Sequence, residues 1–413
     1  MNAHPNILLI GTADTKADEL LFLKTQIEKA DGRCTIMDVG VLNDPPFIPE
    51  ISRHDVAVAA GTNNQAIIEL GNEHEAMVVQ ARGATIIAEQ WVKEHKVDGV
   101  LAIGGTMATD LALDVVNSLP LGIPKFIVST VAFSAILPPE RICADVMMIL
   151  WSGGLYGLNS ICASILSQAA HAVVGASQHS KALVESKPLI GMTSLGSSTL
   201  KYMKYLKPEI EQRGFELAVF HTTGMGGRAF ESLAEKKQFA AVMDFSLIEV
   251  CDEIFDSAFS SGKNRLEAAG KAGIPQIVAP GGVTLVDLCA WADVPERFKD
   301  REIYTHNRLV ACAKITPAER VQVAKVIAEK LNKAKGPTAF IMPLTGIDEW
   351  DKDGGPFEDQ QGLRDFAREI TQSLHENVDL HELDAHINDQ QFADTALQIL
   401  DQWIASGKVS MGH

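Results

Sequence analysis

The chain has 413 residues, 46% of them hydrophobic and 22% charged, a composition typical of a globular protein with about two or three domains. Its formal net charge of −17 argues against a nucleic-acid-binding surface, because contacts to phosphates require clustered Lys and Arg. The sequence shows neither an apolar run of about 18 residues nor a basic leader with a cleavage site, so we expect no transmembrane helix and no signal peptide.

Strand and helix patterns alternate along the first half of the chain. Apolar runs predict strands at 7–10, 34–39, 100–103, 125–128 and 146–150, with amphipathic helices at 76–92 and 107–116 and a hydrophobic helix at 158–174. Such alternation is typical of a parallel sheet covered by helices on both faces. We therefore predict an N-terminal Rossmann-like, nucleotide-binding subdomain at residues 1–180.

The second half repeats this rhythm after a polar segment at 175–187, which we interpret as a helix end and a linker. Strands are expected at 189–192, 217–220, 240–243, 276–279, 338–342 and 378–383, and helices at 200–210, 228–234, 265–269, 317–331, 362–374 and 389–404. The predicted fold class is α/β, with a second Rossmann-like, doubly wound parallel-sheet subdomain at residues 188–413.

Two glycine pairs occur in matching frames. Gly104-Gly105 and Gly281-Gly282 each follow an apolar run, and in each case four residues separate the pair from a following Asp-Leu. We interpret both pairs as the turn from a strand into a helix, where backbone N–H groups face an approaching anion. Since Gly11 and Gly191 precede the pairs at similar distances, the pattern predicts one half-fold used twice by duplication.

The first-half loops carry the candidate nucleotide contacts, because doubly wound sheets bind ligands at the carboxyl ends of their strands. Lys16 is a candidate partner for phosphate, and Asp14 a candidate Mg²⁺ ligand or helix cap. The full set of candidate cofactor-binding residues is Gly11, Thr12, Asp14, Thr15, Lys16, Asp38, Arg82, Gly83, Gly104, Gly105 and Thr106. A turn with solvated side chains is the alternative, and neither G-x-x-x-x-G-K-[ST] nor G-x-G-x-x-G is present.

The second-half loops are candidates for a second ligand. The segment at 221–228 combines glycines, hydroxyls and an Arg after a strand, a pattern that suits a phosphate, a carboxylate or an oxyanion. His221 and His306 stand where a general base would serve catalysis, with a structural histidine as the alternative. The candidate second-ligand residues are Thr193, Ser194, Gly196, Ser197, Ser198, Gly224, Met225, Gly226, Gly227, Arg228 and Asp244.

Other catalytic and metal-binding patterns are absent from the sequence. The six cysteines form no C-x-x-C pair, which favours buried thiols in a reducing compartment, and we expect a cytoplasmic protein without membrane or nucleic-acid contacts. No His/Cys set has metal-site spacing, and no G-x-S-x-G nucleophile elbow occurs.

Five motifs together resemble a known family. They are Ile-Gly-Thr-Ala-Asp-Thr-Lys (10–16), Ala-Ile-Gly-Gly-Thr (102–106), Thr-Thr-Gly-Met-Gly-Gly (222–227), Tyr-Thr-His-Asn (304–307) and Gly-Gly-Pro-Phe (354–357). In order and over nearly the whole chain, they resemble the N-terminal domain of the tomato mosaic virus resistance protein and its stand-alone bacterial relatives.

The resemblance implies two Rossmann-like subdomains, a homodimer and ATP binding with Mg²⁺, with nucleotide contacts at 11–16 and 104–106. Because the plant protein continues into a barrel-like domain, a separate barrel-type protein partner is left open. We hypothesise a cytoplasmic ATP-binding protein, with phosphoryl transfer to, or activation of, a small acid or sugar if it is an enzyme. The alternatives are a non-catalytic, ATP-dependent protein-interaction module and an ATP-independent lyase or isomerase of small acids.

Overall fold

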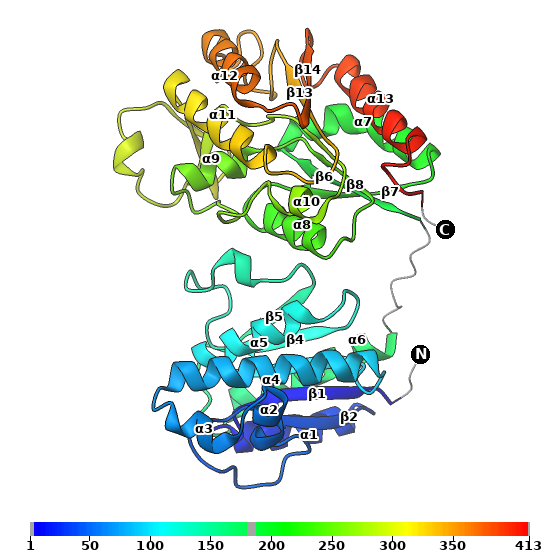
Figure 1. Ribbon diagram of the computed structural model, residues 1–413. Coiled ribbons are helices and arrows are strands. Elements are labelled where there is room, and N and C mark those ends of the chain that lie inside the picture. Colours follow the sequence, from blue (N-terminus) through cyan, green and yellow to red (C-terminus); the bar gives the residue numbers. More distant parts are fainter. Residues whose placement is uncertain (1–3, 180–186, 412–413) are drawn as a thin grey trace. The chain divides into compact units, whose positions relative to one another are not determined.

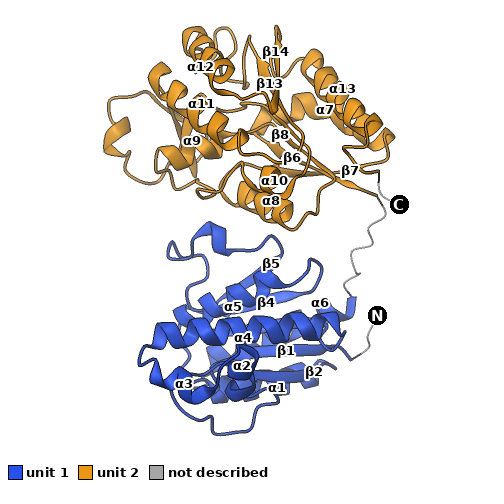
Figure 2. Ribbon diagram, viewed as in Figure 1, with its two compact units in different colours: residues 1–184 blue, residues 185–413 orange. Residues whose placement is uncertain are grey.

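The computed structural model describes residues 4–179 and 187–411, and the chain divides into two compact units (Figure 2). Unit 1 comprises Met1–Val184 and unit 2 comprises Glu185–His413. The helix at the end of unit 1 continues to His179. The linker expected to follow it at 180–186 lies outside the described residues.

Unit 1 is built on a parallel sheet of five strands (Figure 1). Its strands are β1 (Asn6–Gly11), β2 (Arg33–Asp38), β3 (Gly99–Gly104), β4 (Lys125–Ser129) and β5 (Val146–Leu150). They lie in the order β2-β1-β3-β4-β5, and every neighbouring pair is parallel. This is a doubly wound order, in which the chain moves to one side of β1 and then to the other.

Helices cover both faces of this sheet. They are α1 (Ala17–Lys29), α2 (Arg53–Ala59), α3 (Asn64–Glu69), α4 (Glu73–Lys93), α5 (Thr106–Ser118) and α6 (Ser160–His179), with a 3₁₀ turn at Pro139–Arg141. Ile7 and Leu9 of β1 face α1 and α6, whereas Leu8 and Ile10 face α4 and α5. Because side chains alternate along a strand, an apolar run buried on both sides is what a central parallel strand requires.

Unit 2 contains a parallel sheet of six strands and a smaller antiparallel sheet of three. The large sheet contains β6 (Leu189–Ser194), β7 (Glu216–His221), β8 (Ala241–Asp244), β9 (Gln276–Val278), β13 (Thr338–Pro343) and β14 (Val378–Leu383). Read as β7-β6-β8-β9-β13-β14, its order repeats that of unit 1 and adds a sixth strand. The predicted fold class, two Rossmann-like parallel-sheet subdomains, is confirmed.

The helices of unit 2 also form two layers. They are α7 (Gly196–Gln212), α8 (Met225–Glu235), α9 (Ile248–Ile254), α10 (Ala268–Ala272), α11 (Pro317–Leu331), α12 (Gln360–Ser373) and α13 (Gln390–Ala405), with a 3₁₀ turn at Glu296–Phe298. Leu206 of α7 and Phe392 of α13 are buried on one face of the sheet, and Val323 of α11 and Phe366 of α12 on the other. Thr316 starts α11 with a capping box, in which its side chain and that of Glu319 bond each other's backbone N–H.

The second glycine pair does not repeat the structure of the first, so this part of the predicted duplication is wrong. Gly105 leads into α5, but Gly281 and Gly282 lead into a strand of the antiparallel sheet. That sheet consists of β10 (Leu285–Cys289), β11 (Ile303–Thr305) and β12 (Val310–Lys314). A Cβ on Gly281 would lie 2.1 Å from the carbonyl oxygen of Phe245, and Gly282 has φ +78, so these glycines serve a tight backbone crossing.

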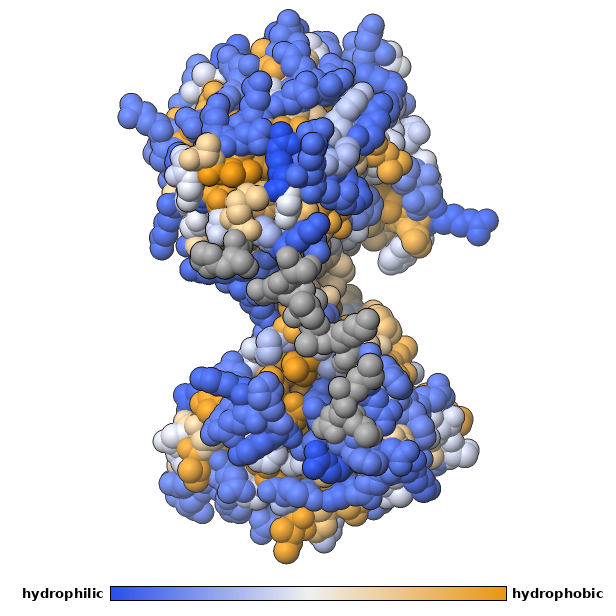
Figure 3. Space-filling model, turned by 90° about the vertical axis from the view of Figure 1, so that its right-hand side faces the viewer, coloured by the Kyte–Doolittle hydropathy of each residue, from blue (hydrophilic) through white to orange (hydrophobic). Residues whose placement is uncertain are grey.

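Among the described residues, one helix, α6, is long and apolar enough to cross a membrane by length and composition. Within unit 1 the helix packs on the sheet, with Leu166, Ala170 and Val173 fully buried. The buried residues recur every three or four positions and so mark one face of the helix. Hydrophilic residues cover most of the face of both units that Figure 3 presents.

Candidate functional site

A cavity lies in unit 1 where β1 and β3 end. In a doubly wound sheet this is the switch point, at which loops diverge to opposite faces and leave a crevice for ligands. The unit-1 cavity measures about 310 Å³. Its lining residues are Thr12, Asp14, Thr15, Val41, Leu42, Glu73, Met77, Gly105, Thr106, Met107 and Ala108. Five of the predicted cofactor-binding residues are therefore brought together: Thr12, Asp14, Thr15, Gly105 and Thr106.

The start of α5 forms one wall of the unit-1 cavity. Gly105 is the N-cap, in extended conformation, and no side chain caps the helix or places a negative charge in its first turn. The first N–H groups of a helix lack intrahelical acceptors, and the helix dipole is positive there. Only Thr130 Oγ1, at 3.7 Å, would lie near a Cβ on Gly105, so its backbone is open to close approach.

Two carboxylates face the same cavity. Asp14 Oδ2 accepts hydrogen bonds from the backbone N–H groups of Leu42 (2.9 Å) and Asn43 (3.2 Å). Asp14 Oδ1 is buried and has no hydrogen-bond partner in the described part of the chain. Glu73, the first residue of α4, lines the cavity from another side. Two carboxylate groups combined with phosphate oxygens form a usual Mg²⁺ ligand set.

Asp38, expected to meet a ribose, instead holds the loops together. It is fully buried at the end of β2, and its Oδ1 accepts from the backbone N–H groups of Ala13 (2.9 Å) and Gly40 (2.8 Å). Burial raises the pKa of this carboxyl group. Asp38 does not line the cavity, and its hydrogen bonds position the loop after β1.

Gly11 and Gly104 act through packing rather than by lining the cavity. A Cβ on Gly11 would lie 2.9 Å from Leu20 Cδ2, and one on Gly104 would lie 2.2 Å from the Cβ of Ala108. Both glycines therefore let a helix start close to its strand, which sets the position of the cavity walls.

Three other predicted residues lie outside the cavity lining. Lys16 places its Nζ 5.1 Å from the centre of the Tyr156 ring, a cation–π geometry. Arg82 and Gly83 are not in a loop but within α4, where Arg82 donates to the carbonyl oxygen of Ala60. A Cβ on Gly83 would lie 2.0 Å from the carbonyl oxygen of Val56, so this glycine allows α2 and α4 to cross. The expected phosphate contacts of Arg82 and Gly83 are corrected accordingly.

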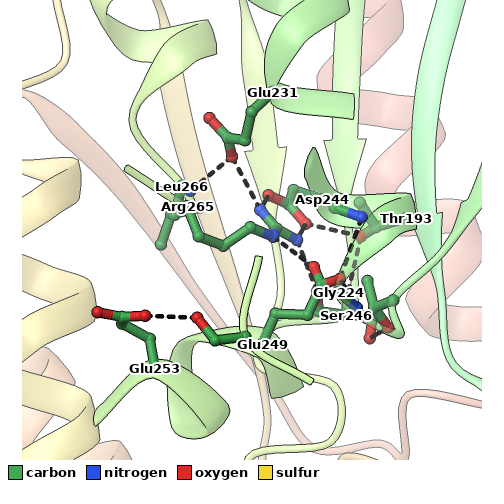
Figure 4. A network of polar contacts seen from close by, with 12 residues as sticks. Thr193, Gly224, Glu231, Asp244, Ser246, Glu249, Glu253, Arg265 and Leu266 are labelled. Atoms are coloured by element: carbon green, nitrogen blue, oxygen red, sulfur yellow. Dashed lines mark hydrogen bonds and ion pairs between the residues drawn. The ribbon is translucent and has the colours of Figure 1, made fainter. Parts of the chain in front are cut away.

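In unit 2, several predicted residues belong to a buried ionic network centred on Arg265 (Figure 4). The Arg265 guanidinium forms two hydrogen bonds with Asp244, at 2.5 and 2.7 Å, and contacts Glu249 at 2.8 Å and Glu231 at 3.1 Å. Thr193 donates to Asp244 at 2.6 Å. Asp244 and Thr193 are thus engaged inside the protein and do not face a second ligand.

The glycine loop after β7 already holds a carboxylate. The backbone N–H groups of Gly224 and Gly227 both donate to Glu249 Oε1, at 2.7 and 3.0 Å. Burial raises the pKa of Glu249 to about 7, while Arg265 and the two N–H groups oppose the shift. The expectation that this loop binds an external anion is therefore corrected, because its anion is a side chain of the same unit.

The rest of that loop is shaped by the same close packing. A Cβ on Gly226 would lie 1.7 Å from the carbonyl oxygen of His221. Met225 and Arg228 belong to α8 and are absent from the lining of the unit-2 cavity described next. Ser194, at the end of the neighbouring strand β6, is buried, and its carbonyl oxygen accepts a hydrogen bond from the Thr222 hydroxyl at 2.8 Å.

A larger cavity, of about 480 Å³, lies at the switch point of unit 2, where β6 ends. Its lining residues are Leu195, Gly196, Ser197, Ser198, Leu200, His221, Thr223, Ile248, Leu285, Asp287, Tyr304, His306, Asn307, Val310, Cys312, Asp348, Glu349 and Trp350. Gly196, Ser197, Ser198, His221 and His306 were predicted from sequence and are brought together here. Asp287, Cys312 and Trp350 were missed, because only strand pairing in the antiparallel sheet and the following loop places them beside α7.

Comparisons with known proteins match both units to one family. The model of the uncharacterised protein family UPF0261 N-terminal domain matches residues 5–182, and that of its C-terminal domain matches residues 187–404. A UPF0261 protein of Brucella melitensis is 52% identical over 416 residues, covering 100% of both chains. A UPF0261 protein of Clostridium tetani is 37% identical, covering 94% of this chain and 96% of its own.

The ToMV resistance protein Tm-1 of Solanum lycopersicum is 29% identical over 420 residues, which cover 94% of this chain and 54% of that protein. The resemblance seen in the motifs is thereby confirmed as a relationship to stand-alone bacterial proteins and, more distantly, to the plant protein. ATP, Mg²⁺ and homodimer formation stay predictions.

Proposed function

The chain belongs to the UPF0261 family, and on that premise we propose that it binds ATP with Mg²⁺ in the unit-1 cavity. The observation that carries the proposal is the joint presence of an uncapped helix start and two carboxylates at a switch point. The helix start suits phosphate oxygens, and the two carboxylates suit the metal that accompanies them. The motif resemblance points to the same two loops.

The phosphates would lie against the start of α5. Backbone N–H groups at Thr106 and Met107 are the donors available there, and the hydroxyl groups of Thr12 and Thr15, 2.9 Å apart, stand on the opposite loop. The lining residues include no Lys or Arg. Neutralisation of the triphosphate therefore falls to the helix dipole and to the metal.

Asp14 and Glu73 would hold the metal. The unpartnered Asp14 Oδ1 is an oxygen for which a cation would supply the missing interaction. When bound, Mg²⁺ would screen the phosphates from the two carboxylates. Val41, Leu42 and Met77 give the cavity an apolar side against which the base or ribose can pack.

Isothermal titration with Mg·ATP tests the site through Gly105→Val. Gly105 has an extended backbone and space around a Cβ, so the fold tolerates the change while the side chain intrudes where phosphate would lie. We expect affinity to fall by at least about tenfold, equivalent to about 1.4 kcal/mol. Gly175→Val is the matched control, because a Cβ there meets nothing within 4 Å and Gly175 lies outside the cavity lining. Equal affinity for Gly105→Val and the control would overturn the proposal.

Lys16 is tested separately. Among the described residues, its ammonium group contacts the carbonyl oxygen of Thr15, at 3.4 Å, and the ring of Tyr156, so a turn toward a bound phosphate would break two weak contacts. Lys16→Ala should weaken Mg·ATP binding if the side chain makes that move. Unchanged affinity would remove Lys16 from the site and leave the cavity assignment standing. ADP release in the same samples separates binding from turnover.

A further inference from the structure

We propose that the unit-2 cavity is a second ligand site, built for an organic acid that also carries hydroxyl groups. Its lining combines helix N–H groups, which attract an anion, with a buried carboxylate, which accepts a hydrogen bond, and a ligand of this class satisfies both. The inference does not depend on the nucleotide site, because every residue that supports it lies in unit 2.

The start of α7 is the part of the cavity that would bind the acid group. Its N-cap, Leu195, supplies no side-chain cap, and the first turn carries no acidic residue. Gly196 has φ +46, and a Cβ at this position would meet nothing within 4 Å. Ser197 and Ser198 add hydroxyl groups beside the free N–H groups. A 17-residue helix with such a start attracts a carboxylate or a phosphate ester.

The second, independent observation is an incompletely paired carboxylate. Asp287, on β10, is only 5% exposed and lines the cavity. Its Oδ1 accepts from the Cys312 thiol at 3.2 Å, a weak donor, and Oδ2 has no hydrogen-bond partner among the described residues. A buried carboxyl group with so little pairing is costly unless a ligand donates to it.

The other acidic residues around the cavity are already engaged. Glu349 forms ion pairs with Lys201 and Lys352. Asp348 accepts from the backbone N–H groups of Trp350 (2.7 Å) and Asp351 (3.1 Å) and from the Thr284 hydroxyl. Asp287 is therefore the acid that calls for a donor from outside, and a hydroxyl group is a donor that an acidic ligand can carry.

Part of the cavity wall is aromatic. Ring centroids of Tyr304 and Trp350 lie 4.8 Å apart, and those of His306 and Trp350 lie 5.5 Å apart. Ile248 and Leu285 add apolar surface. Such a wall packs against the C–H face of a hydroxylated carbon chain or ring, and about 480 Å³ is within the usual range for small-molecule sites.

Titration with four probes tests the inference. D-gluconate and D-glucose 6-phosphate carry an acid and hydroxyl groups and separate carboxylate from phosphate recognition. D-glucose lacks the acid, and acetate lacks the hydroxyl groups. We expect at least one of the first two to bind and to change the tryptophan fluorescence, to which Trp350 of the cavity contributes, with D-glucose and acetate binding at least about tenfold more weakly. Acetate binding as tightly as D-gluconate, or no binding of either acid at millimolar concentration, would overturn the proposal.

Two variants locate the binding. Asp287→Asn removes the acceptor charge, and Leu200→Glu adds a negative charge at a residue that lines the cavity and is 76% exposed, so it spares the fold. Each should weaken the bound acid by about tenfold, whereas Asp379→Asn, on the exposed side of β14, should not. Unchanged affinity in both cavity variants would contradict the site. Gly105→Val should leave acid binding intact, so the two sites fail or stand separately.

Discussion

Replacement of Arg265 by Met is expected to destabilise unit 2 strongly. Arg265 and its three carboxylate partners are each at most 3% exposed in their side chains, so no water replaces the lost guanidinium. Without Arg265, Glu231 would still accept hydrogen bonds from the N–H groups of Leu266 and Ala268. Glu249 would still accept hydrogen bonds from the glycine loop. Asp244 would keep only the Thr193 hydroxyl. Removing one partner of a buried ion pair costs about 3–5 kcal/mol, and we expect a loss in that range at pH 7.

Urea unfolding followed by tryptophan fluorescence and circular dichroism measures this loss. Arg213→Met is the control, because Arg213 forms partly exposed ion pairs with Glu209 and Asp401, worth about 0–1 kcal/mol. The effect of Arg265→Met should shrink at pH 5, below the pKa of about 7 that burial gives Glu249, since protonated partners need no cation. A loss below about 1 kcal/mol at pH 7 would mean that the buried carboxylates do not depend on the guanidinium of Arg265.

Two further perturbations follow from the same unit. Burial raises the pKa of Asp287 to about 6 from 3.8, so the stability that this carboxyl group contributes is present below pH 3.8 and is lost as pH rises through 6. Asp287→Asn should therefore unfold at a higher urea concentration than the wild type at pH 8 and at a similar concentration at pH 4. A Cβ on Gly227 would lie 1.7 Å from Glu249 Oε2, so Gly227→Ala should lower the unfolding free energy by about 1–3 kcal/mol. Gly175→Ala in α6 has space for its Cβ and should raise the unfolding free energy by about 0.5–1 kcal/mol. Equal unfolding free energies for the two variants would contradict this packing.

The alternation of elements could be predicted because it depends on local patterns. Apolar runs such as 7–10 and 100–103 are buried on both faces as central parallel strands, and their length and flanking turns identify them. Ligand-binding loops of a doubly wound sheet follow from the strand order, so Thr12, Asp14 and Gly105 can be identified from the sequence as candidate ligand contacts.

The second glycine pair shows where local patterns mislead. Gly281-Gly282 has the same sequence frame as Gly104-Gly105, but the residues after it pair with β12 as an antiparallel strand. Valine and leucine at 283–288 suit either state, and the pairing partner lies more than 20 residues later. Tertiary context, not local preference, decides such segments.

Charge partners could not be read from the sequence either. The glycine loop at 224–227 has every feature of an anion site, and it does bind an anion, but the anion is Glu249 from α9. Likewise, Asp287 and Cys312 become neighbours only through the register of β10 with β12. A sequence pattern identifies donors and acceptors, whereas the fold decides which of them satisfy one another.

A crystal structure of the Mg·ATP complex would show where the nucleotide binds. We expect density for the phosphates at the ends of β1 and β3, within hydrogen-bond distance of the N–H groups of Thr106 or Met107, and a metal between the phosphates and Asp14. Phosphate density at the start of α7 in the unit-2 cavity, with the unit-1 cavity empty, would contradict it.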